Sequence, residues 1–233
     1  MTSTQATMVG TVGATVLRII LTGLASFILL LEANGYAVNF QTLAVTKVGL
    51  LVVSAQPATA TVTVDNVTIK QQQTQWITKL PAGTYTVSAS TPGYQTWRNP
   101  VQIESGMSRA YPSVWLFLAT PIVTDVRPAT ARELFAPLVD ETLKVDGTEI
   151  WHTMRGQSKL ITRYFEPVQS AVMVGSEHVA VQIGSTIHIL DMDGTNDQVL
   201  MTLPDKRQRR LLVPDDRTLG LLDGTQVTIY RIR

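Results

Sequence analysis

Short runs of alternating apolar and polar residues, separated by turn-forming residues, fill positions 48–118 of this 233-residue chain. Alternation with a period of two is typical of strands that bury one face of a sheet, and in the second run Val62 and Val64 share that face. Seven short strands in about 70 residues predict a small antiparallel β-sandwich. The predicted strands cover residues 48–55, 60–65, 67–70, 75–78, 84–90, 101–105 and 113–118.

Three stretches of this region carry the motifs of a known family: QPATATVTVDN (56–66), LPAGTYTVSASTPGYQTW (80–97) and VWLFL (114–118). On these motifs residues 48–120 resemble the PEGA domain, a small β-sandwich module of prokaryotic surface and envelope proteins. Residues 57–60 keep the first and last of the four letters that name the family, Asn66 replaces its usual Gly, and Thr74-Gln75 replaces Thr-Pro. The resemblance implies a fold and a location outside the cytoplasm, and it brings no catalytic residues.

Two aromatic residues of this region, Tyr94 and Trp97, follow the turn signal Pro92-Gly93. One interpretation is structural, with the ring of Tyr94 folded over the edge of the sandwich and its hydroxyl capping a backbone group. The other is a stacking platform for a sugar ring, since aromatic faces bind the apolar faces of glycans. We keep both residues as candidate ligand contacts.

An apolar run, residues 19–31, follows Arg18 near the N-terminus. A membrane-spanning helix needs about 20 residues, and extension back to about residue 12 reaches that length. Arg18 then lies within the span, where its insertion costs at most roughly 2.5–3.5 kcal/mol. We therefore expect a single transmembrane helix over about 12–31, with the later residues outside the cytoplasm. A cleaved signal peptide ending at residues 35–37 and a buried core helix are the alternatives.

The C-terminal region contains a repeat: DGTEIWH (146–152), IGSTIHI (183–189) and DGTQVTI (223–229). Gly147, Gly184 and Gly224 are spaced 37 and 40 residues apart, and each lies in the predicted turn of a β-hairpin. A period near 40 built from hairpins is typical of β-propeller blades. Residues 143–233 are therefore predicted to form a propeller-like fragment, and residues 121–142, with a short helical patch at 131–135, are predicted to form a linker.

Two to three blades are fewer than the four to eight of a closed propeller, so apolar faces of the repeats stay open. Self-association through these faces is one way to cover them. Packing on the preceding module and a self-contained sheet domain are the alternatives.

Composition and motifs argue against most kinds of chemistry. The chain has no Cys, which excludes disulfides, thiolate metal sites and a Cys nucleophile, and its net charge of +1 gives no field toward nucleic acid. His152 and His188 with Glu177 make a poor zinc set. The segment DMDGTND (191–197) has an Asp-Gly turn like a calcium loop but lacks Glu at the twelfth position. We predict no catalytic residues, no metal site and no cofactor.

The one charge run, KRQRR (206–210), is interpreted either as a solvated loop balanced by nearby aspartates or as a contact for an anionic partner. Its candidate ligand residues are Lys206, Arg207, Arg209 and Arg210. Together these features predict a non-catalytic, membrane-anchored binding or scaffolding protein of the prokaryotic cell envelope. The expected partner is a cell-wall glycan or another envelope protein. An accessory subunit of an envelope enzyme, an enzyme built on the tail, and a secreted protein are the alternatives.

Overall fold

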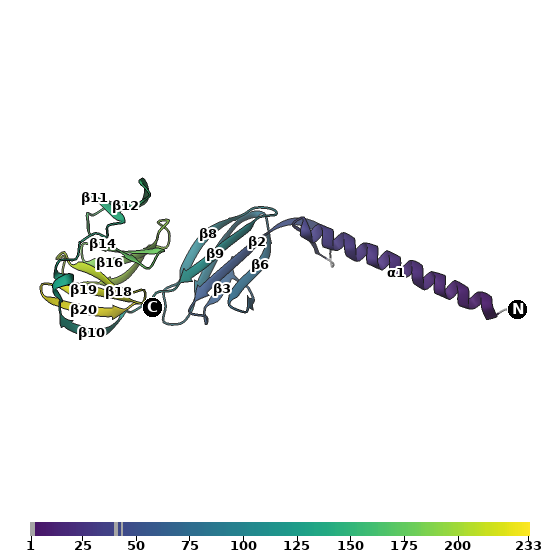
Figure 1. Cartoon of the computed structure of the whole chain (residues 1–233), viewed down its shortest axis with the longest axis horizontal. Coiled ribbons are helices and arrows are strands. Elements are labelled where there is room, and N and C mark those ends of the chain that lie inside the picture. Colours follow the sequence, from purple (N-terminus) through teal and green to yellow (C-terminus); the bar gives the residue numbers. More distant parts are fainter. Residues whose placement is uncertain (1–2, 40–41, 43) are drawn as a thin grey trace. The chain divides into compact units, whose positions relative to one another are not determined.

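The computed structural model describes residues 3–39, 42 and 44–233, and these residues form two helices and twenty strands (Figure 1). The helices are α1 (Ser3–Ala33) and α2 (Ala131–Leu134). The strands are β1 (Tyr36–Asn39), β2 (Ala44–Gln56), β3 (Thr61–Val64), β4 (Val67–Thr68), β5 (Gln71–Gln72), β6 (Gln75–Pro81), β7 (Gly83–Ser90), β8 (Trp97–Ile103), β9 (Ser108–Trp115), β10 (Ile122–Pro128), β11 (Leu143–Asp146), β12 (Glu149–Met154), β13 (Gln157–Arg163), β14 (Val168–Val174), β15 (His178–Ile183), β16 (Thr186–Asp191), β17 (Gln198–Thr202), β18 (Arg210–Asp215), β19 (Thr218–Asp223) and β20 (Gln226–Arg231). The chain is mainly β, as the alternation predicts.

Helix α1 contains an apolar segment, Val16–Ala33, that is long enough to cross a membrane, and none of its side chains is buried. At about 1.5 Å per residue, the 18 residues of this segment match the thickness of a bilayer core, about 30 Å. The exposure contradicts the alternative of a buried core helix. A membrane anchor and a signal peptide both fit this helix.

The end of α1 is closed by a short cap. The side-chain amide of Asn34 donates to the carbonyl of Leu30 over 2.7 Å, and the backbone N–H of Gly35 donates to the carbonyl of Glu32 over 3.1 Å. Gly35 then adopts a left-handed conformation with φ +77°, which turns the chain into β1. A Cβ at this position would also meet the Cα of Gly106 at 2.9 Å, so the position requires glycine.

Two sheets contain the strands of the predicted sandwich. One has the order β1-β2-β6-β5, with β9 also paired to β2, and the other has the order β4-β3-β7-β8. Val62, Val64, Val87 and Ala89 are buried, as their spacing predicts, and β8 alternates buried and exposed residues along its whole length. The sheet β4-β3-β7-β8 thus buries one face, as a sheet of a β-sandwich does.

Local turn signals are confirmed in this region. Asp65 and Asn66 have φ of 46° and 68° and connect β3 to β4 as a two-residue hairpin of type I′. Strand β8 begins at Trp97, four residues before the predicted start at 101. The prediction began late because proline is unfavourable inside a strand, and Pro100 lies within this one. Pro100 is tolerated there because β8 is the edge strand of its sheet.

Three further antiparallel sheets contain the repeat region: β11-β12-β13, β14-β15-β16-β17 and β10-β20-β19-β18. The three repeat glycines each begin a two-residue hairpin turn, between β11 and β12, between β15 and β16, and between β19 and β20. In these turns the glycine has φ between 53° and 61° and the next residue does not have positive φ, as in type II′ turns. The predicted hairpins are therefore correct, with Gly-Thr or Gly-Ser rather than Asp-Gly at the centre.

Strand β15, with the sequence HVAVQI, is buried at every position. Val179, Val181 and Ile183 belong to one apolar cluster, and Ala180 belongs to another. The sheet β14-β15-β16-β17 is thus covered by an apolar cluster on each face. The first cluster has the buried members Leu143, Ile150, Ile161, Ala171, Val179, Val181, Ile183 and Leu190. The second has Phe117, Val174, Ala180, Ile187, Ile189, Leu200, Leu203, Leu211, Leu219, Leu221 and Ile232.

The segment predicted as a linker contains a strand that the sequence analysis missed. Strand β10 pairs antiparallel with β20 along its length, from Ile122 opposite Arg231 to Pro128 opposite Gln226. Its side chains are mostly exposed, so the segment lacks the one-sided alternation that identifies a strand. The predicted helical patch is present as α2, with a capping box formed by Thr130 and Glu133.

The chain divides into two compact units. The first comprises the described residues of Met1–Ser54 with Ile69–Tyr85 and Pro100–Pro112. The second comprises Ala55–Thr68, Thr86–Asn99 and Ser113–Arg233. The ion-pair network, the Trp97 contacts and the pocket described below lie within the second unit.

Candidate functional site

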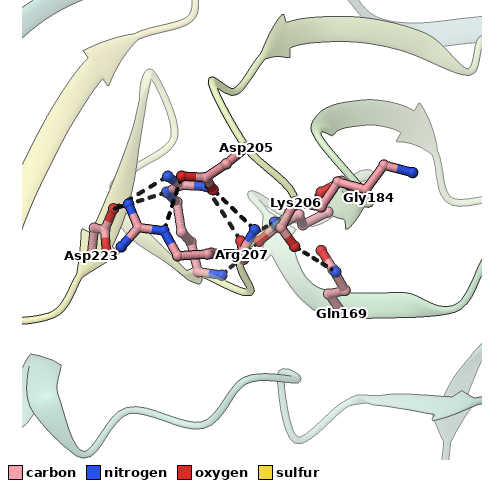
Figure 2. A network of polar contacts seen from close by, with 8 residues as sticks. Gln169, Gly184, Asp205, Lys206, Arg207 and Asp223 are labelled. Carbon is pink, nitrogen blue, oxygen red and sulfur yellow. Dashed lines mark hydrogen bonds and ion pairs between the residues drawn. The ribbon is translucent and has the colours of Figure 1, made fainter.

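The basic run is tied into a network of ion pairs in the second unit (Figure 2). The guanidinium of Arg207 contacts Asp205 over 2.9 Å and Asp223 over 3.3 Å, and that of Arg209 contacts the same two carboxylates over 3.0 and 3.2 Å. Lys206 pairs with Glu166 over 3.6 Å. The N–H of Arg207 and both guanidinium groups lower the pKa of Asp205 to about 2. The aspartates that balance the run are therefore Asp205 and Asp223.

Hydrogen bonds from a buried side chain to the backbone also hold this loop in place. The buried amide of Gln182 donates to the carbonyl of Arg207 over 2.7 Å and accepts from the N–H of Arg209 over 2.7 Å. The side chain of Arg209 is 5% exposed, and Arg210 donates to the carbonyl of Leu134 over 2.5 Å. Arg209 and Arg210 are thus committed to internal contacts, whereas Lys206 and Arg207 keep exposed side chains.

The loop DMDGTND holds an aromatic side chain from β8. The indole N–H of Trp97 donates to Oδ2 of Asp191 over 3.1 Å, and the amide of Asn196 donates to the same oxygen over 2.8 Å. Asn196 also accepts the backbone N–H of Arg98 over 2.8 Å. Burial raises the pKa of Asp191, and the hydrogen bonds from Trp97 and Asn196 oppose that shift. Trp97 is 4% exposed, so it offers no free ring face to a ligand.

His178 continues this chain of contacts from β15. Its Nε2 lies 3.3 Å from Oδ1 of Asp191, and its Nδ1 lies 3.0 Å from Nη2 of Arg233. Because the guanidinium is always a donor, Nδ1 accepts and the ring proton belongs on Nε2, facing Asp191. Burial, and then the charge of Arg233, lower the pKa of His178 to about 3.

Tyr94 lies in a second region of the same unit, where four backbone hydrogen bonds join segments that are far apart in the sequence. The N–H of Leu116 donates to the carbonyl of Gln56 (2.9 Å), and that of Gln95 donates to the carbonyl of Phe117 (2.7 Å). The N–H of Leu118 donates to the carbonyl of Ile232 (2.8 Å), whose own N–H donates to the carbonyl of Arg217 (2.9 Å). The side chains flanking these bonds therefore share one surface.

A pocket of about 240 Å³ occupies this surface, and we call it the Tyr94 pocket. Tyr94 and Trp115 contribute half-buried aromatic rings, and Arg217 and Arg233 contribute positive charge. The indole N–H of Trp115 donates to Oγ of Ser113 over 2.8 Å. The lining of the pocket is completed by Gln56, Pro57 and Leu116. Two aromatic rings and two guanidinium groups thus surround one cavity.

Comparison with known proteins agrees with the sheets and turns of residues 48–109. These residues match the family model of the PEGA domain. No curated protein matches the chain. The match ends at Arg109, near the start of β9.

The PEGA segment supplies part of the Tyr94 pocket, and the later residues supply the rest. Gln56, Pro57 and Tyr94 lie inside the matched range, and Trp115, Arg217 and Arg233 lie beyond it. With its N-terminal apolar helix, the PEGA match fits a membrane-anchored or secreted envelope protein.

The remaining candidates for chemistry lie apart. His152 is on β12 and His188 is on β16, where Nδ1 of His188 contacts Asp197 over 2.7 Å. In the described part of the chain, no three His, Asp or Glu side chains form a group that could hold a metal ion. The sequence pattern indicated Tyr94 but not Trp115, Arg217 or Arg233, because only long-range backbone pairing brings these positions together.

Proposed function

We propose that this protein is a non-catalytic, membrane-anchored binding protein of the prokaryotic cell envelope, and that its binding site is the Tyr94 pocket. Helix α1 holds the chain in the membrane, with the N-terminus inside and the PEGA segment and the later sheets outside the cytoplasm. The observation that carries the proposal is the meeting of two aromatic rings at one cavity, Tyr94 from within the PEGA match and Trp115 from beyond it.

The ligand class that suits this pocket is a cell-wall glycan. Aromatic faces such as those of Tyr94 and Trp115 contribute apolar contact area, and a cavity of about 240 Å³ accommodates one sugar unit of a longer chain. The basic loop is a weaker candidate for the same role, because Arg207 and Arg209 are already paired with carboxylates.

Retention of the full-length protein, kept in mild detergent, on purified insoluble cell-wall glycan tests this proposal. We expect the parent protein to be retained and Tyr94→Ala to be released at lower competitor concentration. Tyr85→Ala is the matched control, because Tyr85 is also half-buried but its hydroxyl donates to Pro81 and it does not line the pocket. A parent protein that flows through unretained ends the glycan proposal and favours a protein partner, such as an envelope enzyme to which this chain is an accessory subunit.

We further infer that the three C-terminal sheets are propeller-like blades. The repeated hairpins support this, as does β10, which adds the outer strand to the sheet of β18, β19 and β20. Ile122, Val123 and Val126 on β10 are 45–51% exposed, so self-association would cover them. Size-exclusion chromatography with light scattering in detergent measures this directly, and a single protein copy per micelle at all concentrations rules out self-association.

A further inference from the structure

We propose that the Tyr94 pocket takes an anionic sugar unit, whose carboxylate or phosphate group binds between the guanidinium groups of Arg217 and Arg233. This inference rests on the proposed function as a glycan-binding protein and names the chemical class of the ligand. It is carried by the charges at the pocket, which a neutral glycan does not need.

Arg233 is held firmly by aromatic and imidazole groups. Its guanidinium carbon lies 4.4 Å from the ring centroid of Trp115 and 4.9 Å from that of Phe117, and Nη2 contacts Nδ1 of His178. These contacts fix the orientation of the planar group without neutralising it, since all three partners are uncharged in this state. The guanidinium is therefore positioned for a ligand before the ligand arrives.

The charge of Arg233 is poorly compensated by the protein itself. Its Nε is buried and has no hydrogen-bond partner among the described residues. In the same part of the chain, the ion pairs include no carboxylate partner for Arg233, and Asp216 and Glu177 act on it from longer range. Burial lowers the pKa of Arg233 to about 10, so the group stays charged at neutral pH. A half-buried cation that has no direct carboxylate partner favours an anion in the adjoining cavity.

Arg217 brings a second positive charge to the same cavity. Its carbonyl accepts the N–H of Ile232 over 2.9 Å, so residue 217 lies beside the residue that precedes Arg233. Its N–H donates to Oδ1 of Asp215 over 2.7 Å, and its side chain is exposed and lines the pocket. Among the ion pairs of the described residues none involves Arg217, in contrast to Arg207 and Arg209.

Two guanidinium groups suit an oxyanion that accepts several hydrogen bonds at once. Arginine forks match the oxygens of a carboxylate or a phosphate, and such charge-assisted bonds are about twice as strong as neutral ones. The rings of Tyr94 and Trp115 then offer apolar contact to the sugar that carries the anion. Acidic sugars and sugar phosphates share this chemistry, and the experiment separates them.

Isothermal titration of the full-length protein in mild detergent, with three oligosaccharide probes of equal length, tests the inference. The probes are an oligomer of a uronic acid, an oligomer of a sugar phosphate and a neutral oligomer of N-acetylglucosamine. We expect at least one acidic probe to bind at least about tenfold more tightly than the neutral probe. Its affinity should fall as the NaCl concentration rises from 50 to 500 mM.

Variants assign the effect to the pocket. We expect Arg217→Gln to weaken binding of the acidic probe by about tenfold, and Arg217→Gln with Arg233→Gln to abolish the preference over the neutral probe. Arg231→Gln is the matched control, because Arg231 is exposed on β20 two residues away and does not line the pocket. Since Arg217 is exposed, its single variant is not expected to unfold the protein, and circular dichroism checks this.

The outcomes separate the two proposals. Equal binding of the neutral and acidic probes overturns the anionic class while the glycan function stands. Acidic binding that Arg217→Gln and Arg231→Gln change equally overturns the assignment to this pocket. Failure of all three probes, together with no retention on cell-wall glycan, overturns the proposed function itself, whereas retention without any probe binding overturns only the anionic inference.

Discussion

The indole N–H of Trp97 donates to Oδ2 of Asp191 over 3.1 Å and thereby joins the first residue of β8 to the last residue of β16. The two residues are 94 positions apart in the sequence. The same carboxylate accepts from Asn196, and the carbonyl of Thr96 accepts the side-chain amide of Gln198 over 2.8 Å. The segment DMDGTND, together with Gln198, thus serves as a docking loop for residues 96–98.

Replacement of Trp97 by Phe keeps the ring buried and removes the N–H. We expect the full-length protein to lose about 1–3 kcal/mol of unfolding free energy, because a hydrogen bond from a buried indole to a charged group is lost. Urea denaturation in mild detergent measures this. Trp151→Phe is the control, since the N–H of Trp151 donates to an equally exposed carboxylate, Glu149, but the ring of Trp151 is only half-buried. Equal losses in the two variants would contradict a special role of the Trp97–Asp191 bond.

Gly194, at the tip of the docking loop, is predicted to tolerate no side chain. Its φ is +85°, and a Cβ would overlap the carbonyl oxygen of Ile161 on β13. Gly175 also has a positive φ, +65°, but has open space around it. Gly175→Ala should cost about 1 kcal/mol of unfolding free energy, from backbone strain alone. Gly194→Ala should cost at least about 2 kcal/mol more, because the loop must move. The difference in urea midpoint between the two variants measures the overlap, and similar midpoints would show that the loop yields freely.

The hairpins were predictable from the sequence because their signals are local. Asp65-Asn66 and the repeat glycines each specify a turn within four residues, and the alternation around Val62 and Val64 identifies the buried face. Strand β10 was not predictable in this way. Its side chains are exposed on both faces, and it is a strand because its backbone pairs with β20, about a hundred residues later.

The candidate site was predictable only in part, for the same reason. Tyr94 stood out as an aromatic residue beside a turn, but the pocket forms through backbone bonds from Leu118 to Ile232 and from Ile232 to Arg217. No pattern of residue spacing in the sequence predicts such long-range pairing. The basic run stood out by composition, yet its role depends on Asp223 and Gln182, whose contact with Arg209 becomes visible only in the folded sheets.

The two paired arginines of the basic run are predicted to differ sharply in their contribution to stability. Both contact Asp205 and Asp223, but the side chain of Arg209 is 5% exposed and that of Arg207 is 68% exposed. Arg209→Gln should lower the unfolding free energy by about 2–3 kcal/mol, because a buried side chain loses its charge-assisted hydrogen bonds to Asp205 and Asp223. Arg207→Gln should leave the urea midpoint nearly unchanged, because water screens an exposed pair. If Arg207→Gln destabilised as much as Arg209→Gln, burial would not be the deciding factor.

The stability of the second unit is predicted to fall in mild acid because of His178. Its pKa is about 3 in the folded protein, through burial and the charge of Arg233, against about 6.5 in an unfolded chain. Between these values the unfolded chain binds the extra proton, so the contribution of His178 to stability is fully present above pH 6.5 and is lost as the pH falls toward 3. At pH 5 the expected loss is about 2 kcal/mol. Asp191, which faces His178 and whose pKa is raised by burial, contributes in the opposite direction and reduces the net loss.

Urea denaturation of the full-length protein at pH 7, 6 and 5 measures this dependence. His178→Gln removes the titrating group, so the variant should start less stable at pH 7 and lose less than the parent on acidification. His152→Gln is the control, since His152 is half-buried on β12 and lies outside the contacts of Asp191 and Arg233. Its stability should follow the parent curve at each pH. A parent curve that stays flat from pH 7 to 5, or one that His178→Gln leaves equally steep, would show that another group governs the acid sensitivity.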